Sequence, residues 1–306
     1  MDKIDLHIPN ETARLRAVIL GTAMSNGAAP SLEEAYDPKS REHIAAGTYP
    51  QNPDMIIEMA HVAAVLSKYD VAIFSPVQIQ DYNQIFTRDI GFVIGDTFVK
   101  SNILPDRDQE IEAIQHILNK IDPSKIIKPP EEVHVEGGDV MVHNDYIFVG
   151  TYRGDDYPNF ITARTNVQAV EWLEKTFPNK KVVSFNLRKS NEVARDNALH
   201  LDCCFQPVGH NKCIIHRNGF LEEEEYEFLV DLFGKQNCFE LTKDEMYHMN
   251  SNIFSIAPDV VISERGFTRL NDWLRSHNIT VEEVPYAEIA KQEGLLRCST
   301  LPLIRD

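Results

Sequence analysis

One stretch of the sequence decides how the chain is expected to fold, and it is GLLRCSTLPLIRD, residues 294–306. Cys298 stands in it between a leucine-rich approach and the apolar run LPLI, residues 301–304. Chain ends are usually frayed, so this apolar run predicts that the segment is tied into the core. A lone cysteine is most often a small buried apolar residue. Arg297 beside it nevertheless makes Cys298 a candidate thiolate nucleophile, because a neighbouring cation favours the charged form.

Outward from that stretch, one local pattern recurs along the chain. An apolar hairpin, a segment of helical periodicity and a further strand follow one another about five times, at spacings of roughly 40–60 residues. The clearest hairpins are 91–99, 140–149 and 253–262. Helices are predicted over 55–68, 107–121, 166–176, 222–233 and 269–277, and further strands over 17–20, 71–74, 181–185, 213–215 and 280–284. Because no low-complexity linker interrupts the repeat, residues 1–306 are predicted to form a single α/β domain of radial or solenoid architecture.

The composition excludes several classes of function. The chain has 306 residues, 47 acidic and 30 basic, and a formal net charge of -17. Such a surface repels nucleic acids and anionic membranes, so neither is an expected partner, whereas a small cationic substrate is. No apolar run approaches the ~20 residues of a membrane-spanning helix, and the first residues carry no apolar signal core. Five cysteines without a C-x-x-C pair indicate free thiols and a cytoplasmic location.

Three further motifs carry polar residues suited to catalysis. EGGD, residues 136–139, precedes a predicted strand, and its glycines permit a tight turn that aims a carboxylate. His200 and Asp202 share one face if their segment is extended. FTRD, residues 86–89, places an aspartate at the mouth of a hairpin. Taken singly, each has an ordinary alternative as an acidic turn or a surface histidine near an aspartate.

No metal or organic cofactor is predicted. A spacing of three residues separates His210, Cys213 and His216. On a strand, residues three apart lie on opposite faces, which argues against a metal site. The sequence contains no P-loop, G-x-G-x-x-G or H-E-x-x-H motif. Cys203 and Cys204 lie in what the pattern predicts to be an apolar strand, where core packing is their expected role.

In this order, the motifs at 86–89, 136–139 and 200–202, followed by Cys298, resemble the guanidino-group-modifying enzymes, also called the pentein or amidinotransferase superfamily. Within it the chain is most similar to arginine deiminases, and residues 252–306 resemble their C-terminal region. The resemblance implies a pseudo-fivefold, five-bladed α/β propeller made of hairpin–helix–strand modules. This agrees with the repeat described above.

The resemblance also implies catalytic roles. Cys298 would attack the guanidinium carbon and form a covalent thiouronium intermediate. His200 would protonate the departing amine and then activate water, with Glu136 orienting it. The products would be ammonia and a ureido compound. No cofactor would be needed.

Five more residues are expected to bind substrate on the same basis. Asp89 and Asp202 would grip guanidinium nitrogens, since carboxylates match that planar fork. Phe86 would stack on the guanidinium plane. Arg164 matches a family arginine that binds the substrate carboxylate. Asn252 is also expected to bind the substrate.

The sequence departs from arginine deiminases just before the nucleophile, where Glu293 stands at the position of an arginine that binds the substrate carboxylate. Several activities therefore stay open. They are a deiminase, an amidinotransferase that passes the amidino group to an amine, a dihydrolase that yields ornithine, and a non-catalytic guanidine-binding protein. A cysteine peptidase fits less well, because two extra pocket carboxylates have no role in amide attack. The family likeness also implies a homo-oligomer.

Overall fold

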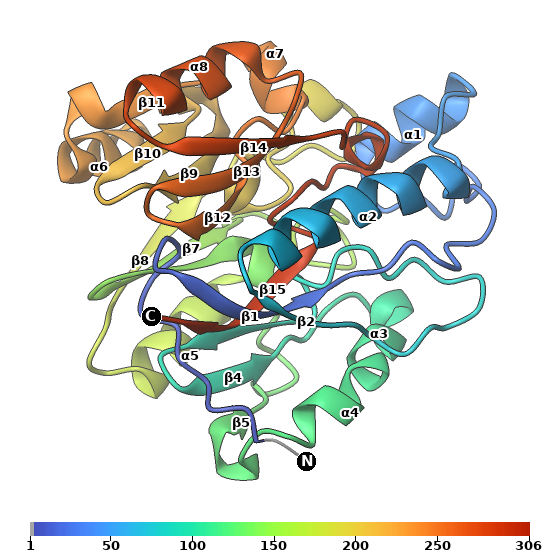
Figure 1. Ribbon diagram of the computed structural model, residues 1–306, viewed down its shortest axis with the longest axis horizontal. Coiled ribbons are helices and arrows are strands. Elements are labelled where there is room, and N and C mark those ends of the chain that lie inside the picture. The colour runs from blue at the N-terminus through green and yellow to red at the C-terminus, as the bar shows by residue number, and fades with distance from the viewer. Residues whose placement is uncertain (1–2) are drawn as a thin grey trace.

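The computed structural model describes residues 3–306 and contains five three-stranded sheets (Figure 1). Each sheet has the same plan: the middle strand is antiparallel to one neighbour and parallel to the other. The sheets are β15 (Thr300–Arg305), β1 (Leu15–Leu20) and β2 (Ala72–Phe74); β3 (Gly91–Ile94), β4 (Thr97–Lys100) and β5 (Ile126–Ile127); β6 (Val140–His143), β7 (Tyr146–Thr151) and β8 (Lys181–Asn186); β9 (Phe205–Val208), β10 (Lys212–Ile215) and β11 (Cys238–Glu240); and β12 (Phe254–Ala257), β13 (Val260–Glu264) and β14 (Thr280–Val284).

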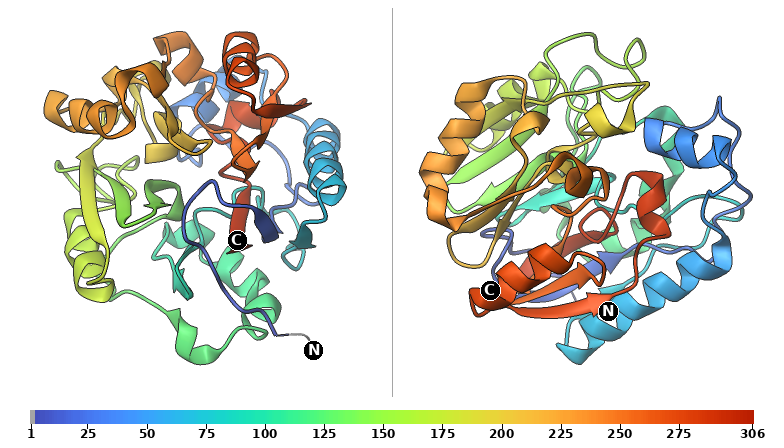
Figure 2. Two further views of the ribbon diagram at one scale, coloured as in Figure 1. Left: turned by 60° about the vertical axis from the view of Figure 1, so that its left-hand side comes forward. Right: turned by 90° about the horizontal axis from the view of Figure 1, so that it is seen from above.

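Helices connect the two parallel strands within each sheet, as a parallel crossover requires. In chain order they are α1 (Pro38–Ala45) and α2 (Asn52–Lys68) between β1 and β2, α3 (Gln109–Ala113) and α4 (Gln115–Leu118) between β4 and β5, α5 (Val167–Thr176) between β7 and β8, α6 (Glu223–Phe233) between β10 and β11, and α8 (Thr268–Ser276) between β13 and β14. A short helix, α7 (Lys243–Tyr247), follows β11. Figures 1 and 2 show α2, α6 and α8 on the outside of the molecule. The predicted hairpin–helix–strand repeat is thus confirmed.

Two predictions about local structure were wrong. The single helix predicted over 107–121 is divided at Ile114, whose φ and ψ of −102° and 3° lie outside the helical region. His200–Asp202 is not extended: Leu201–Cys203 forms a 3-10 turn, and strand β9 begins only at Phe205. Cys203 and Cys204 therefore precede the strand in which they were predicted to lie, although both are buried as expected.

Strand β15 completes the first sheet by pairing antiparallel with β1, so that Leu20 lies opposite Thr300 and Leu15 opposite Arg305. Its apolar side chains Leu301 and Leu303 are fully buried. The prediction that the LPLI run is tied into the core is therefore confirmed. This pairing also fixes the position of Cys298, two residues before the strand.

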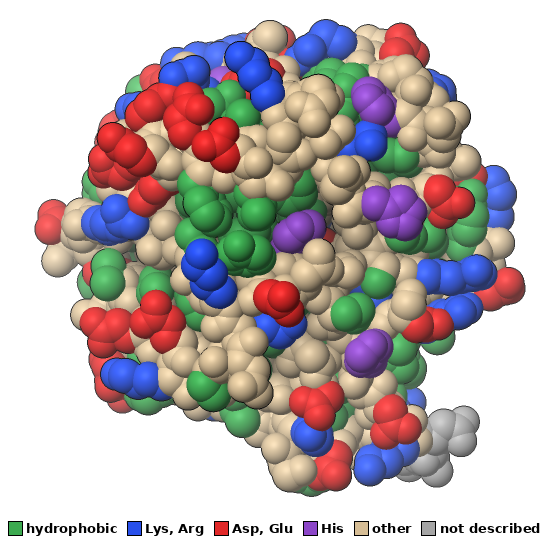
Figure 3. Space-filling model, turned by 90° about the vertical axis from the view of Figure 1, so that its left-hand side faces the viewer, with side chains coloured by type: hydrophobic (Ala, Val, Ile, Leu, Met, Phe, Trp, Pro, Cys, Tyr) green, Lys and Arg blue, Asp and Glu red, His purple; other side chains and the backbone are tan. Residues whose placement is uncertain are grey.

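Buried apolar side chains form two groups. The larger contains Phe148, Phe205 and Phe254, together with the inner faces of α2, α6 and α8. The smaller lies around β3, β4 and α5. None of the helices within residues 3–306 combines the length and apolar character needed to cross a lipid bilayer. Charged side chains of both signs are scattered over the face shown in Figure 3, with acidic ones gathered at its upper left.

Candidate active site

The residues predicted to act on substrate occupy the same place in different sheets. In each sheet, one of them lies at most five positions before the strand that forms the antiparallel edge. These residues are Asp89 before β3, Glu136 before β6, His200 before β9, Asn252 before β12 and Cys298 before β15. Each of the five sheets therefore contributes one side chain, and the repeat of the fold brings them to one region.

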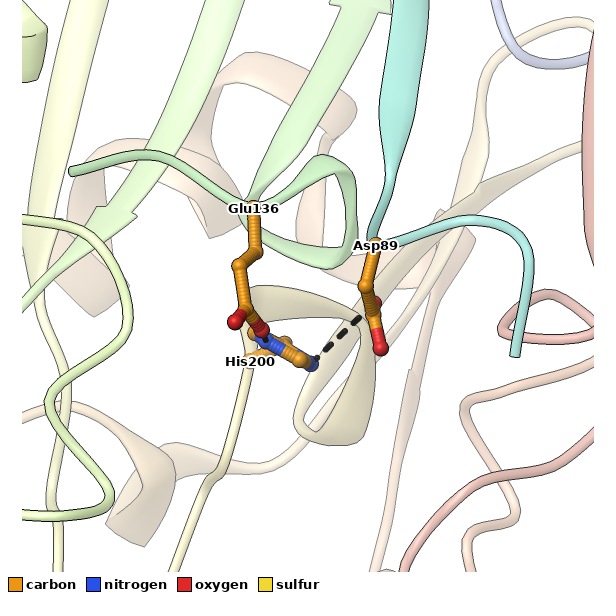
Figure 4. Close-up of side chains that lie close together, drawn as sticks. All are labelled: Asp89, Glu136 and His200. Atoms are coloured by element: carbon orange, nitrogen blue, oxygen red, sulfur yellow. Dashed lines mark hydrogen bonds and ion pairs between the residues drawn. The ribbon is translucent and has the colours of Figure 1, made fainter. Parts of the chain in front are cut away.

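His200 lies between two carboxylates (Figure 4). Its Nε2 is 2.7 Å from Oε2 of Glu136, and its Nδ1 is 3.8 Å from Oδ1 of Asp89. A side chain at position 138 would collide with the imidazole, since a Cβ there would lie 2.6 Å from the ring. Gly138 of the EGGD motif therefore lets the backbone approach His200 closely, which refines the predicted role of the glycine pair.

The charges around His200 set its protonation. Burial alone lowers the pKa of His200, but the carboxylates of Asp89, Asp139 and Glu136 outweigh this and raise it above the ordinary value. Burial likewise opposes ionisation of Glu136, yet Arg164 and His200 lower its pKa to about 2. The pair is thus an imidazolium beside a carboxylate. This arrangement suits a general acid held by an orienting anion.

Cys298 is held from two sides. Its backbone N–H donates to Oδ1 of Asn252 at 3.1 Å, and Nδ2 of Asn252 donates to its Sγ at 3.2 Å. The Sγ lies 3.7 Å from Oδ2 of Asp202. Asn252 was expected to bind substrate, whereas its observed contacts in the structure are with Cys298 and with the backbone carbonyl of Asp202.

The prediction that Arg297 favours a Cys298 thiolate was wrong. Burial, followed by the negative charges of Asp202 and Asp89, raises the pKa of Cys298 well above that of an ordinary thiol. The Arg297 guanidinium instead binds Asp202 through Nη1 at 2.8 Å and Glu11 through Nε at 3.1 Å. The empty site therefore holds a protonated thiol, and a cation that enters it would favour ionisation.

A cavity of about 840 Å³ contains this region. Cys298, His200 and Asp89 line it, as do Phe86 and Arg164. The Phe86 ring packs against the backbone just before the nucleophile. A Cβ at position 294 would lie 2.3 Å from that ring, so Gly294 is the residue that fits there. Asp202 reaches the site through Cys298 and is not among the cavity-lining residues.

Two arginines lie at the cavity wall. Arg107, which the sequence analysis did not identify, donates to Asp89 Oδ2 at 2.8 Å and to the Phe86 carbonyl at 3.1 Å, and also binds Glu110 at 2.7 Å. Arg164 binds Glu136 at 3.3 Å. Arg107 was predicted only as the first residue of a helix, whereas it ends the 3-10 turn Pro105–Arg107 that precedes α3.

The same acidic residues bear on metal binding. Within residues 3–306, Asp89, Glu136 and His200 offer ligand atoms that lie within 4.8 Å of one another. His200 and Glu136 are already hydrogen-bonded to each other and Asp89 is paired with Arg107. These mutual contacts account for the cluster without an ion. His216, one of the residues with apparent metal spacing, bonds instead to the carbonyl of Leu241 through Nδ1.

Fold and site together define an enzyme of the C–N hydrolase class that acts on amidines, within the guanidino-group-modifying superfamily. A family model described as N,N dimethylarginine dimethylhydrolase, eukaryotic, matches residues 50–305. The chain belongs to this family.

Curated relatives match about three quarters or more of the chain. The uncharacterized protein YkgA of Bacillus subtilis (strain 168) is 29% identical over 80% of this chain and 78% of its own length. An arginine deiminase of Pediococcus pentosaceus is 24% identical over 73% of this chain. That match spans 62% of the deiminase, so the chain corresponds to part of the longer protein.

Solved structures share the fold at low sequence identity. The N-terminal domain of ArgZ, bound covalently to a reaction intermediate, aligns with a TM-score of 0.77 and 16% identity, over 94% of this chain and 98% of its own. The inosamine-phosphate amidinotransferase StrB1 of Streptomyces griseus aligns with a TM-score of 0.75 and 15% identity, over 99% of this chain and 97% of its own. The predicted α/β fold of the amidinotransferase type is thereby confirmed.

Proposed function

We propose that this protein hydrolyses the guanidino group of a small cationic, arginine-like substrate, and releases ammonia and a ureido product. One observation carries the proposal: Cys298, the His200–Glu136 pair, Asp89 and Asp202 lie in or directly beside one acidic cavity, on the segments that precede β15, β9, β6 and β3. The family description adds methylated arginines to the substrates to be considered, for which an alkylamine would leave in place of ammonia.

Substrate binding is the first step. Asp89 presents Oδ1, a buried oxygen without a hydrogen-bond partner, and Asp202 presents a carboxylate beside Cys298. Both would accept N–H bonds from the substrate guanidinium, while Phe86 covers its plane. The arriving positive charge offsets the aspartates that hold the pKa of Cys298 high. In the complex with substrate the thiol then loses its proton to solvent water, which leaves the Cys298 thiolate.

Covalent chemistry follows. The Cys298 thiolate attacks the guanidinium carbon and forms a C–S bond. His200, protonated beside Glu136, gives its proton to the departing nitrogen as the C–N bond breaks and ammonia leaves. The neutral imidazole then takes a proton from water, and the hydroxyl attacks the thiouronium carbon. Breaking the C–S bond releases the ureido product and the cysteine.

We propose further that the five sheets are the blades of a five-bladed propeller and that residues 1–306 form one domain. The shared strand plan supports this, as does the order in which the colours follow one another round the molecule in the left-hand view of Figure 2. A cytoplasmic location is supported by the five cysteines, all free thiols within residues 3–306. Homo-oligomerisation stays a prediction, to be measured by light scattering.

The test is product identification. The purified protein is incubated with arginine, agmatine and methylated arginines in the absence of an amine acceptor, and products are identified by mass spectrometry. Ammonia, or an alkylamine, together with a ureido product is the expected result. Ornithine with carbon dioxide would indicate a dihydrolase. Turnover that begins only when an amine such as glycine is added would indicate an amidinotransferase.

A further inference from the structure

The cavity carries far more negative charge than the proposed chemistry uses. Its lining includes two arginines, Arg107 and Arg164, and eight carboxyl side chains. The eight are Glu33, Glu34, Asp37, Asp81, Asp89, Asp106, Glu110 and Glu293. Asp89 and Asp202 are the carboxylates proposed to bind the guanidinium group. The other carboxyl groups of the lining therefore bear on the charge of the rest of the substrate.

Neither arginine of the cavity is free to bind a substrate carboxylate. Arg107 holds Glu110 through two hydrogen bonds of 2.7 and 3.1 Å and Asp89 through a third of 2.8 Å. Arg164 is paired with Glu136 at 3.3 Å and also donates to a backbone carbonyl at 2.9 Å. A substrate carboxylate would have to displace one of these anions. The cavity thus disfavours an anionic far end.

Glu293 presents an unused acceptor in the same cavity. Its Oε1 accepts a hydrogen bond from Asn197 Nδ2 at 2.7 Å, while its Oε2 is buried without a hydrogen-bond partner. Asp37 is its acidic neighbour, and it also caps helix α1 by accepting from the backbone N–H of Ser40 at 2.7 Å. Burial, followed by the charge of Asp37, raises the pKa of Glu293 well above its usual range. A cation beside these two carboxyl groups would favour their charged form.

The charge of Lys39 acts on Glu293 and Asp37, but Lys39 donates its Nζ to the carbonyl oxygen of Tyr247 and is not among the residues that line this cavity. Glu293 is adjacent to Gly294, whose backbone packs on the Phe86 ring, so the carboxyl pair lies next to the proposed guanidinium site. Oε2 of Glu293 is thus available to accept a hydrogen bond from another group of the guanidine substrate.

Resting on the proposed function, we propose that Glu293 and Asp37 bind a primary ammonium at the far end of the substrate. The substrate class is then a guanidinoalkylamine, for which agmatine is the probe, and free arginine is a poorer substrate. The ammonium donates to Oε2 of Glu293, and its charge offsets those of Glu293 and Asp37. A charge-assisted hydrogen bond of this kind is about twice as strong as a neutral one.

The first test compares agmatine, arginine and 5-guanidinopentanoate, which keeps the carboxylate and lacks the amine. We expect kcat/KM for agmatine to exceed that for arginine by about tenfold or more, and 5-guanidinopentanoate to be the poorest. An arginine value equal to or above that of agmatine would overturn the inference while leaving the proposed function intact.

The second test uses Glu293→Gln, which retains an amide oxygen for Asn197 and removes the charge. We expect KM for agmatine to rise about tenfold or more, with kcat and the values for arginine little changed. Asp37→Asn, which keeps a helix-capping side chain, is expected to act in the same way. Glu192→Gln, which removes an exposed carboxyl outside the cavity, is the matched control and should leave KM and kcat for both substrates unchanged. Equal losses for both substrates would show that Glu293 only maintains structure.

Failure of the proposed function is recognised separately. If the wild-type protein releases no product from any guanidine, binding of agmatine and of arginine is measured by isothermal titration calorimetry. Tighter binding of agmatine that is weakened about tenfold or more in Glu293→Gln would still support the ammonium site. Tighter binding of arginine would overturn it.

Discussion

Charged side chains are buried both around Arg297 and around His200, but the two regions differ in how fully these side chains are hydrogen-bonded. Arg297 uses Nε, Nη1 and Nη2 to bind Glu11, Asp202 and the Val140 carbonyl at 2.8–3.2 Å. In the cavity beside it, oxygens of Asp89, Glu136 and Glu293 are buried without a hydrogen-bond partner.

Unpaired buried acceptors cost free energy because they have lost their water. This difference in hydrogen bonding indicates where a ligand would bind. The Arg297 cluster is complete and supports the fold, whereas the cavity cluster is incomplete and awaits donors. Substitutions on the two sides should therefore separate activity from stability.

The largest expected effect is on activity alone. Cys298→Ser should lower kcat by roughly 10⁴-fold or more, since removal of a nucleophile removes the covalent route. The melting temperature should stay close to that of the wild type, because the change is nearly isosteric. Ammonia release and thermal unfolding are measured on the same preparation. Substantial residual turnover would refute the assignment of the nucleophile.

On the other side of the comparison, Arg297→Met should lower the free energy of unfolding by about 3–5 kcal/mol, because it leaves Glu11 and Asp202 buried without their cation. Urea unfolding measures the loss. Arg195→Met removes an exposed pair with Asp244 and is the matched control, for which about 0–1 kcal/mol is expected. Equal costs in the two variants would mean that the Arg297 cluster is not the support described here.

A smaller effect is expected from Asp89→Asn. It should weaken binding of a guanidine about 10- to 100-fold, because one charged acceptor becomes a neutral amide. The affinity is measured by calorimetry in the Cys298→Ser background, which prevents turnover. Asp106→Asn, at another part of the cavity wall, is the control. Unchanged affinity in Asp89→Asn would show that this carboxylate does not contact the substrate.

The smallest effect concerns the resting nucleophile. Because its pKa is raised, Cys298 should be alkylated by iodoacetamide several-fold more slowly at pH 7 than an ordinary exposed thiol. The rate should rise with each step in pH and show no plateau below about pH 9, since the thiolate is the reactive form. Mass spectrometry of the modified peptide gives the rate. A plateau near neutral pH would mean that the thiolate exists before substrate arrives.

Much of this arrangement follows from local sequence patterns. The hairpins, four of the five predicted helices and the recurrence of the three-stranded unit agree with the structure, because alternation and helical periodicity are properties of adjacent residues. His200 and Asp202 were predicted to share one face of an extended segment, whereas they lie at a 3-10 turn. Their roles toward a substrate stay predictions.

Other parts of the site could not be predicted from local patterns. Arg107 pairs with Asp89, 18 residues earlier, from a 3-10 turn that helical periodicity does not indicate. Glu11 pairs with Arg297 across most of the chain length. The pKa of Cys298 is raised by burial and by Asp202 and Asp89, whose approach to the thiol is set by tertiary packing. These are choices of tertiary packing, on which local propensity has little influence.

The pairing of β15 with β1 has a consequence for how activity arises during folding. Bringing Thr300 to Leu20 closes most of the chain into a single loop, and a contact at such a separation forms late because its closure entropy is paid first. Cys298 reaches its neighbours only when that loop closes. We expect the other four sheets to form before this pairing is made, in a molecule in which Cys298 still lacks its hydrogen-bond partners.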